Sequence, residues 1–528
     1  MQRVETTVLV IGGGPVGLTL ALELGQRGIP TLVVEPRTEL DPLRPRAKTT
    51  SIRTMEHFRR LKIAEAVRRR AYLPVGWSQA VCFGRTVLGP EIWRFEGVFG
   101  LVPGQDRRWA EAGQQIPQFQ VEAALREAVA ALPCVSVWYG WRFEQFLERE
   151  ERGATAVVAN AQGEARAVAA RFVAAADGAQ SPVRHALGIA LEGAHAPRPN
   201  LNAVFTCPEL TRHLEGRRAV QYWTVNPEAP GHLGPLDLEG RWWTILVGMQ
   251  TTRVEEVVRA IHRQIGRPLP VEVLALDPWR AHMCVAGRFQ SGAVFLVGDA
   301  AHLNPPYGGH GFNTGVGDAV NLGWKLAARI QGWGGEALVA SYEVERRPIA
   351  QAVVEVATEN MRWLAAELAE VPEGDANRLR EVIRTVKAPE FYSLGLVLGY
   401  RYERSPVIWD DGTSWPSWDP VEYRPTAHPG SRLPHTWLDS STSLYDRLGL
   451  GFTLIQVAAE AKVAAWQEAA SRLGLPLAIF PYHPDLEAAW REELEAPLVL
   501  VRPDQHVAWR GDDREPPEPI LRQVAGLS

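Results

Sequence analysis

Residues 7–35 read TVLVIGGGPVGLTLALELGQRGIPTLVVE, and their pattern indicates the architecture of the amino-terminal region. The β-branched and apolar run over 7–11 is typical of a parallel strand that is covered on both faces. A helix is expected over about 18–24, followed by a second strand over 31–34 that closes with Glu35. A strand, a helix and a second strand in this order indicate a doubly wound α/β domain.

The turn after the first strand carries a nucleotide-binding pattern. Gly12, Gly14 and Gly17 satisfy Gly-x-Gly-x-x-Gly, which allows a tight turn and lets a pyrophosphate approach the positive end of the following helix. Glu35 stands eighteen residues after Gly17, where a carboxylate accepts hydrogen bonds from ribose hydroxyls and disfavours a 2′-phosphate. The sequence therefore predicts a site for an adenosine diphosphate-like nucleotide.

A second glycine-rich stretch, residues 298–317, follows the apolar run 293–297, which has the composition of a buried strand. Asp299 is therefore expected at the carboxyl end of a strand, where it can accept hydrogen bonds from ligand hydroxyls. Two prolines restrict the path of the loop, and its glycines let the backbone approach a flat ring. A helical pattern begins at Thr314. Taken alone, the stretch also fits an ordinary strand–loop–helix turn.

Composition points to a small-molecule partner. The 528 residues are 46% hydrophobic and 22% charged, as expected for a globular protein of two or three domains. The net charge of −5 is spread without long blocks of one sign, so no nucleic-acid or anionic membrane partner is expected. No signal peptide or membrane span is recognised, and we expect a cytoplasmic protein. The four cysteines are too far apart to suggest a metal site or a dithiol pair: Cys82, Cys134, Cys207 and Cys284.

A third segment, AADGAQSPVR at 175–184, completes a set of three spaced motifs. Together they resemble the single-component FAD-dependent aromatic hydroxylases of the para-hydroxybenzoate hydroxylase superfamily. In that family the Asp-Gly segment serves both FAD and the nicotinamide cofactor, the Gly-Asp segment binds the ribityl chain, and the loop 305–313 lies beside the isoalloxazine. The resemblance implies that FAD is bound by Gly12, Gly14, Pro15, Val16, Gly17, Glu35, Arg46, Gln118, Asp177, Gly178, Gly298, Asp299, Pro306, Gly309, Gly311, Phe312 and Asn313.

The chain continues well beyond SYEVERRP at 341–348, as do the phenol-type hydroxylases and those that tailor polyketides and indolocarbazoles. This implies an α/β fold with a discontinuous Rossmann-like FAD-binding domain, a β-sheet substrate domain and a C-terminal thioredoxin-like α/β domain. The last domain contains no cysteine, so a role in packing or assembly is favoured, in a monomer or a homodimer. The expected divisions are 1–185 (first segment of the FAD-binding domain, with a substrate-domain insertion near 75–115), 186–285 (substrate sheet), 286–400 (second segment of the FAD-binding domain and a helical region), 401–430 (linker) and 431–528 (thioredoxin-like).

Two expected strands, 221–225 and 241–247, are rich in aromatic residues and are assigned to the substrate sheet. Candidates for the substrate wall are Tyr222, Trp223, Arg241, Trp243 and Tyr307. Core packing explains the tryptophans equally well. His310 in the glycine-rich loop either tunes protonation of the flavin or the substrate, or simply bonds the backbone. No catalytic residue is identified, and no metal is expected.

The resemblance implies an NADPH- or NADH-dependent monooxygenase that uses FAD and O2. It would hydroxylate an aromatic, phenolic or polycyclic substrate through a flavin C4a-hydroperoxide. Related chains carry out Baeyer–Villiger or decarboxylative oxygenation with the same motifs. A flavoprotein that sequesters a pathway intermediate without turning it over is a further alternative. The motifs leave the substrate and the choice of nicotinamide open.

Overall fold

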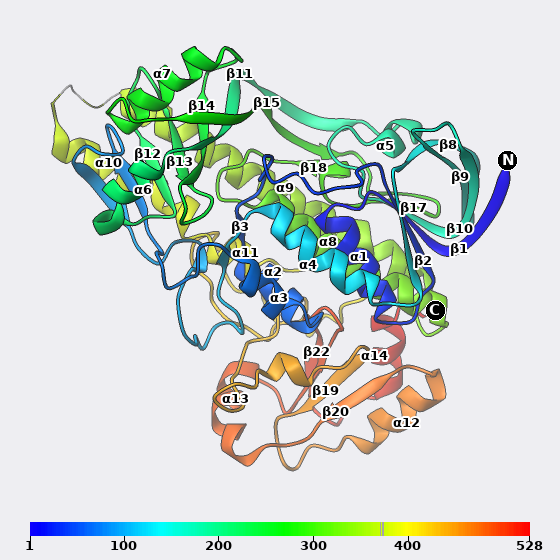
Figure 1. The fold of residues 1–528 in the computed structure, drawn as a ribbon. Helices are drawn as coiled ribbons and strands as arrows, with labels where there is room; N and C mark the ends of the chain where they lie inside the picture. Colours follow the sequence, from blue (N-terminus) through cyan, green and yellow to red (C-terminus); the bar gives the residue numbers. More distant parts are fainter. Residues whose placement is uncertain (370, 372–373, 528) are drawn as a thin grey trace.

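The computed structural model describes residues 1–369, 371 and 374–527 (Figure 1). The two largest sheets have eight strands each, and a four-stranded sheet forms a separate layer near the carboxyl terminus. Within these residues, no helix combines the length and the apolar character needed to cross a membrane. The fold class is the one expected: a mixed α/β protein with a Rossmann-like unit, a β-sheet unit and a small C-terminal α/β unit.

The first sheet has the order β16-β17-β10-β1-β2-β7, and β9 and β8 extend it beside β10. Central strand β1 is parallel to both neighbours, and Val10 pairs with Ala174 on one side and Val33 on the other. Burial of both faces explains its unbroken apolar run. The strands are β1 (Gln2–Ile11), β2 (Thr31–Glu35), β7 (Val135–Tyr139), β8 (Trp141–Glu150), β9 (Gly153–Asn160), β10 (Ala165–Ala175), β16 (Gln290–Ser291) and β17 (Val294–Leu296).

Four long helices pack with this sheet: α1 (Pro15–Gly25), α4 (Gln118–Ala130), α8 (Gly311–Gln331) and α9 (Glu336–Ala369). Helix α1 contacts both α4 and α8, as Figure 1 shows at the centre of the molecule. The sequence pattern placed the start of helix α8 at Thr314, but the helix begins three residues earlier, at Gly311. The carbonyl of His310 accepts the backbone N–H and the hydroxyl of Thr314, at 2.8 and 3.0 Å, so the first turn is already closed at Thr314.

The second sheet has the order β18-β15-β11-β14-β13-β12-β4-β5. Strands β4 and β5 come from the segment near 75–115 and pair with strands that follow residue 190. Long strands β11 and β15 pair along their length and link this sheet to the first unit (Figure 1). The strands are β4 (Val81–Gly84), β5 (Glu91–Phe95), β11 (Leu191–Thr206), β12 (Gln221–Thr224), β13 (Gly231–Pro235), β14 (Arg241–Val247), β15 (Glu272–Ala286) and β18 (His302–Leu303).

Helices cover the second sheet on its two sides. Helix α7 (Val254–Ile265) packs Val257 and Ile261 against Trp242 of β14, whereas α10 (Ala376–Phe391) packs Phe391 near Trp223 of β12. The short elements of the first two units are α2 (Ile52–Arg60), α3 (Ala64–Arg70), α5 (Pro182–Ala186), α6 (Pro208–His213), α11 (Leu394–Leu398), β3 (Thr49–Thr50) and β6 (Gln114–Gln115).

The C-terminal unit has the sheet order β20-β19-β21-β22. Strands β21 and β22 form an antiparallel hairpin around residues 503–505, and α12 connects the parallel strands β19 and β20. Its core is shared with the first unit, because Trp324 of α8 packs against Phe452 with ring centroids 6.0 Å apart. The elements are β19 (Phe452–Gln456), α12 (Ala464–Leu473), β20 (Leu477–Phe480), α13 (Glu487–Leu494), β21 (Leu498–Val501), β22 (Val507–Gly511) and α14 (Pro517–Val524).

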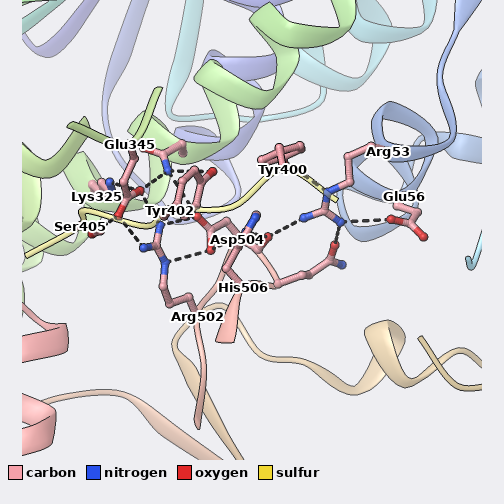
Figure 2. Close-up of polar contacts among 12 residues, drawn as sticks. Arg53, Glu56, Lys325, Glu345, Tyr400, Tyr402, Ser405, Arg502, Asp504 and His506 are labelled. Carbon is pink, nitrogen blue, oxygen red and sulfur yellow. Dashed lines mark hydrogen bonds and ion pairs between the residues drawn. The ribbon is translucent and has the colours of Figure 1, made fainter. Parts of the chain in front are cut away.

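A buried ion network holds the C-terminal unit against α8 and α9 (Figure 2). Glu345 of α9 accepts from Lys325 of α8 at 2.6 Å and from both terminal nitrogens of Arg502 at 2.6 and 2.8 Å. Arg502 also donates to Asp504 at 2.6 Å. Burial alone would raise the pKa of Glu345, but the charges of Arg502 and Lys325 outweigh burial and hold it below its usual range. Glu345 therefore stays ionised at neutral pH.

Replacing Arg502 with methionine should destabilise the protein by about 3–5 kcal/mol, because Glu345 and Asp504 would remain buried without their shared partner. Chemical denaturation at pH 7, followed by tryptophan fluorescence, measures the change. The effect should shrink in acid, since the depressed pKa of Glu345 makes its contribution disappear as the pH falls. Arg472→Met is the control, because its ion pair with Glu518 is exposed. Equal midpoints for both variants would contradict the role of the network.

Candidate cofactor and substrate site

The three motifs meet at the carboxyl ends of β1, β10 and β17. Gly12 follows β1 with a φ of 107°, and a Cβ atom there would lie 2.2 Å from the carbonyl oxygen of Ala176. A Cβ atom at Gly17, in the first turn of α1, would lie 1.9 Å from the carbonyl oxygen of Gly12. Only glycine fits at either position, so the start of α1 is held directly beside Asp177.

Glu35 lies at the end of β2 and faces the same turn. One carboxylate oxygen accepts the Gly13 N–H at 2.7 Å, and the other accepts the Arg37 backbone N–H at 3.0 Å and its side-chain Nε at 2.7 Å. The acid is therefore oriented by three donors at the edge of the glycine turn. This is the position from which a carboxylate can bind a ribose.

A cavity of about 940 Å³ extends from this turn to the second sheet. Most of the residues expected to bind FAD line it: Gly12, Gly14, Pro15, Val16, Glu35, Arg46, Gln118, Asp177, Gly178, Asp299, Pro306, Gly309, Gly311 and Phe312. Two of the residues expected in the substrate wall also line it, Trp243 and Tyr307. One cavity thus joins segments that are nearly three hundred residues apart in the sequence.

Three of the expected cofactor residues support the cavity from behind its surface. Gly17 packs on the glycine turn, and Gly298 packs against Val16. Asn313 lies in the first turn of α8, where its side-chain amide donates to the carbonyls of Thr49 at 3.0 Å and Gly309 at 2.6 Å. Asn313 therefore ties the glycine-rich loop to the segment after Arg46.

Asp299 lies in the short turn after β17, and its side chain is exposed into the cavity. Enclosure by the surrounding protein raises the pKa of its carboxyl, against the opposing charges of His302 and Arg46. Asp177 is also enclosed, which raises its pKa, and its Oδ1 atom has no hydrogen-bond partner among the described residues. Two acceptors in one cavity fit a ligand that carries several hydroxyl groups, such as the ribityl chain of FAD.

The N-terminus of α8 opens toward the same space. Gly311 and Phe312 line the cavity in the first turn of the helix, where backbone N–H groups lack partners within the helix. The aligned peptide dipoles make this end of the helix favourable for negative charge. His310, just before it, is buried, and burial lowers its pKa to about 4. His310 is therefore neutral at pH 7.

The sequence reasoning missed Asp318, which lies beneath the glycine-rich loop. This fully buried carboxylate accepts the Gly298 N–H at 3.1 Å, His302 Nε2 at 2.8 Å and Arg346 Nε at 2.7 Å. It therefore fixes the loop that presents Asp299. An isolated aspartate inside the apolar face of α8 was the available signal, because a buried carboxylate requires partners.

The far end of the cavity is a ring compartment on the second sheet, which we define by Lys48, Gln221, His232, Trp243, Tyr307 and Glu390. Trp223 supports it from behind, because its ring stacks on His232 with centroids 4.2 Å apart. Lys387 lies 4.4 Å from the Trp223 ring and forms a buried ion pair with Glu390. Planar aromatic walls with a few polar groups suit a flat ligand.

The structure places Tyr222 and Arg241 outside the cavity, contrary to our expectation of a substrate wall. Tyr222 points to the opposite face of the sheet, where its hydroxyl donates to the Arg217 carbonyl at 2.8 Å and accepts the Ala219 N–H at 2.9 Å. Arg241 is partly exposed and pairs with Asp237 at 2.5 Å. Neighbouring residues of a strand point to opposite faces, so Trp223 and Trp243 are on the cavity side while Tyr222 is not.

Comparison with known proteins identifies two families along the chain. Residues 5–357 match the family described as FAD binding domain, and residues 426–526 match the family described as aromatic-ring hydroxylase, C-terminal. The chain is 31% identical to the tetracenomycin A2 monooxygenase-dioxygenase of Streptomyces glaucescens, over 100% of this chain and 98% of that protein. It is 29% identical to the 2,4-dichlorophenol 6-monooxygenase of Cupriavidus pinatubonensis, over 96% and 93% of the two chains.

Solved structures give the same result over the whole chain. The rebeccamycin biosynthetic enzyme RebC with reduced flavin superposes with a TM-score of 0.90 at 33% identity, covering 100% of both chains. The flavin-dependent monooxygenase PieE in complex with FAD and substrate has a TM-score of 0.90 at 30% identity, also covering 100% of both. The chain therefore belongs to the family of FAD-dependent aromatic-ring monooxygenases.

Replacing Asp299 with alanine should weaken FAD binding about 10- to 100-fold, because a hydrogen bond to a charged group contributes about 1.5–3 kcal/mol. Asp299 is outside the hydrophobic core, so the folded structure should persist. Titration of the apoprotein with FAD, followed by flavin fluorescence, measures the dissociation constant. Asp513→Ala, at an exposed position of the C-terminal unit, is the control. A wild-type constant for Asp299→Ala would count against its role.

Proposed function

We propose that this monooxygenase uses NADPH or NADH and O2 to hydroxylate an aromatic or polycyclic ring that carries a hydroxyl group. The observation that carries the proposal is one cavity that is lined both by residues expected to bind the nucleotide, such as Glu35 and Asp177, and by the aromatic ring compartment. The relatives named for tetracenomycin and dichlorophenol add support, since their named substrates are ring compounds.

The residues present fit FAD along the cavity. Glu35 would hold the adenosine ribose, Asp299 the ribityl chain, and the loop that ends at Gly309 the flavin ring. The chemistry that FAD supplies when bound is uptake of a hydride from the nicotinamide and transfer of one oxygen atom of O2 to the ring. The balanced reaction consumes one NAD(P)H, one O2 and one proton, and releases NAD(P)⁺, water and the hydroxylated ring.

The protein contributes placement, charge stabilisation and exclusion of water. Backbone N–H groups of Gly311 and Phe312 would stabilise negative charge at the cofactor edge, aided by the dipole of α8. Trp243 and Tyr307 would hold the substrate ring by its faces and keep the compartment dry. A fixed distance between ring and cofactor favours oxygen transfer over loss of hydrogen peroxide to solvent.

Stopped-flow absorbance tests the proposal. Mixing the oxidised, FAD-loaded protein with NADPH, and in parallel with NADH, should bleach the flavin absorbance, and a hydroxylated aromatic ligand should accelerate the bleaching. In air, mass spectrometry should then find one added oxygen atom per substrate molecule, and NMR should locate it as a ring hydroxyl. An oxygen inserted into a carbon–carbon bond would indicate Baeyer–Villiger chemistry instead. Absence of reduction with every ring compound would favour a flavoprotein that only sequesters its ligand.

A further inference from the structure

Lys48 brings an unpaired amine into the ring compartment. It precedes β3, and its Nζ atom lies 4.0 Å from the centre of the Trp243 ring. The next residue, Thr49, is fixed to the glycine-rich loop: its carbonyl accepts from Asn313 at 3.0 Å, and its Cβ lies 3.2 Å from the Cβ position of Gly309. Lys48 is therefore held where the glycine-rich loop and the second sheet meet.

The amine has no hydrogen-bond or ion-pair partner among the described residues. The two fully buried lysines differ, since Lys325 pairs with Glu345 at 2.6 Å and Lys387 pairs with Glu390. The face of an aromatic ring attracts a cation, but at a desolvated site this attraction contributes only about 2 kcal/mol. It therefore offsets only part of the cost of burying an ammonium group. Burial accordingly lowers the pKa of Lys48 to about 7, so neutral and charged forms coexist at physiological pH.

The titratable groups around Lys48 are either uncharged or already paired. His232 of β13 is buried and lies near both Lys48 and Lys387; burial and these two charges lower its pKa well below the usual value. The nearby carboxylates are already paired, because Glu390 of α10 binds Lys387, and Asp277 of β15 binds Arg44 at 2.7 Å.

Two further groups line the cavity nearby. The pKa of His310 is about 4 because of burial, so this side chain carries no charge at pH 7. The positive charge of Arg46 acts on Asp299, where it lowers the pKa of the carboxyl against the effect of burial. Lys48 is therefore the one group of the compartment, among the described residues, that lacks a counter-charge and titrates near neutrality.

We propose that Lys48 is the general base that takes the proton of the substrate's ring hydroxyl, which makes an acidic phenol, naphthol or hydroxyquinone the preferred substrate class. This rests on the hydroxylation proposed above. The substrate O–H bond breaks as an N–H bond forms on the neutral amine, which leaves a phenolate beside an ammonium ion. The phenolate directs electron density into the ring, and the ammonium returns its proton to the product oxygen.

Trp243 has a defined role in this step. Its ring face lies against the Lys48 nitrogen and stabilises the ammonium once it forms, while Tyr307 and His232 supply no competing charge. The ion pair of phenolate and ammonium then provides the counter-charge that the free protein lacks. A substrate without an ionisable ring hydroxyl would leave the amine unpaired and should bind less tightly.

The proton transfer can be tested in the oxidised holoenzyme, without turnover. Alizarin is a polycyclic phenol whose colour reports its ionisation. It is titrated with the wild-type protein at a pH about one unit below the pKa of free alizarin. Wild-type protein should bind it as the phenolate. Lys48→Met should bind it as the neutral phenol, while Lys462→Met, an exposed change in the C-terminal unit, should behave as wild type. Identical spectra in all three proteins, or no binding to the wild type, would overturn the proposal.

Turnover supplies a second and distinguishable readout. Hydroxylation by Lys48→Met should fall about 10²- to 10⁴-fold near pH 7, the usual contribution of a general base. In the wild type kcat/KM should rise as the pH passes about 7, because only the neutral amine accepts the proton. In Lys48→Met this rise should move to the pKa of the substrate itself, and Lys48→Arg should not restore the original profile.

The two proposals fail in different ways. If NAD(P)H does not reduce the wild-type flavin with any ring compound, the proposed function is wrong. If the wild type hydroxylates its substrate and Lys48→Met keeps the same pH profile, only the role of Lys48 is wrong. Competitive acetylation of the holoenzyme with acetic anhydride, read by peptide mass spectrometry, measures the Lys48 pKa without any substrate. A value near the ordinary one for lysine would also overturn the assignment.

Discussion

The site depends on the close approach of three backbone segments behind the cavity. Gly12 packs on the carbonyl of Ala176, Gly298 lies against Val16, and a Cβ atom at Gly315 would lie 2.6 Å from Val16 and 3.0 Å from the Cα of Gly298. Side chains at these positions would push the segments apart. Since each segment presents the next residues to the cavity, this contact determines where the acids and the start of α8 are placed relative to one another.

Two neighbouring residues of α9 extend this constraint to the rest of the molecule. Arg346 donates to Asp318, which fixes the glycine-rich loop, and Glu345 receives Arg502 from the C-terminal unit. The C-terminal unit is thus attached, through fully buried charges, to the same helix that supports the glycine-rich loop. Buried pairs of this kind are costly to break, so the unit contributes to the rigidity of the site without lining it.

Much of the architecture could be predicted from local patterns. The glycine turn, Glu35 and the Gly-Asp motif lie at the ends of strands that their runs of apolar residues identify. Tyr222 was assigned to the substrate wall because its strand was recognised but the face to which it points was not. Arg241 shares its face with Trp243, but at the start of β14 it pairs with Asp237 and does not line the cavity. Asp318 was missed because its partners, including Arg346, come from segments distant in the sequence.

The order of the elements, the nucleotide-binding motif and the family can be recognised from the sequence alone, because each depends on residues within a few positions of each other. Folding determines which aromatic residues face the cavity and which acids are paired, and it leaves Lys48 without a counter-charge among the described residues. The physical reason is that burial and the electrostatic environment are properties of the packed interior, where residues such as Lys48 and Trp243 meet only after folding.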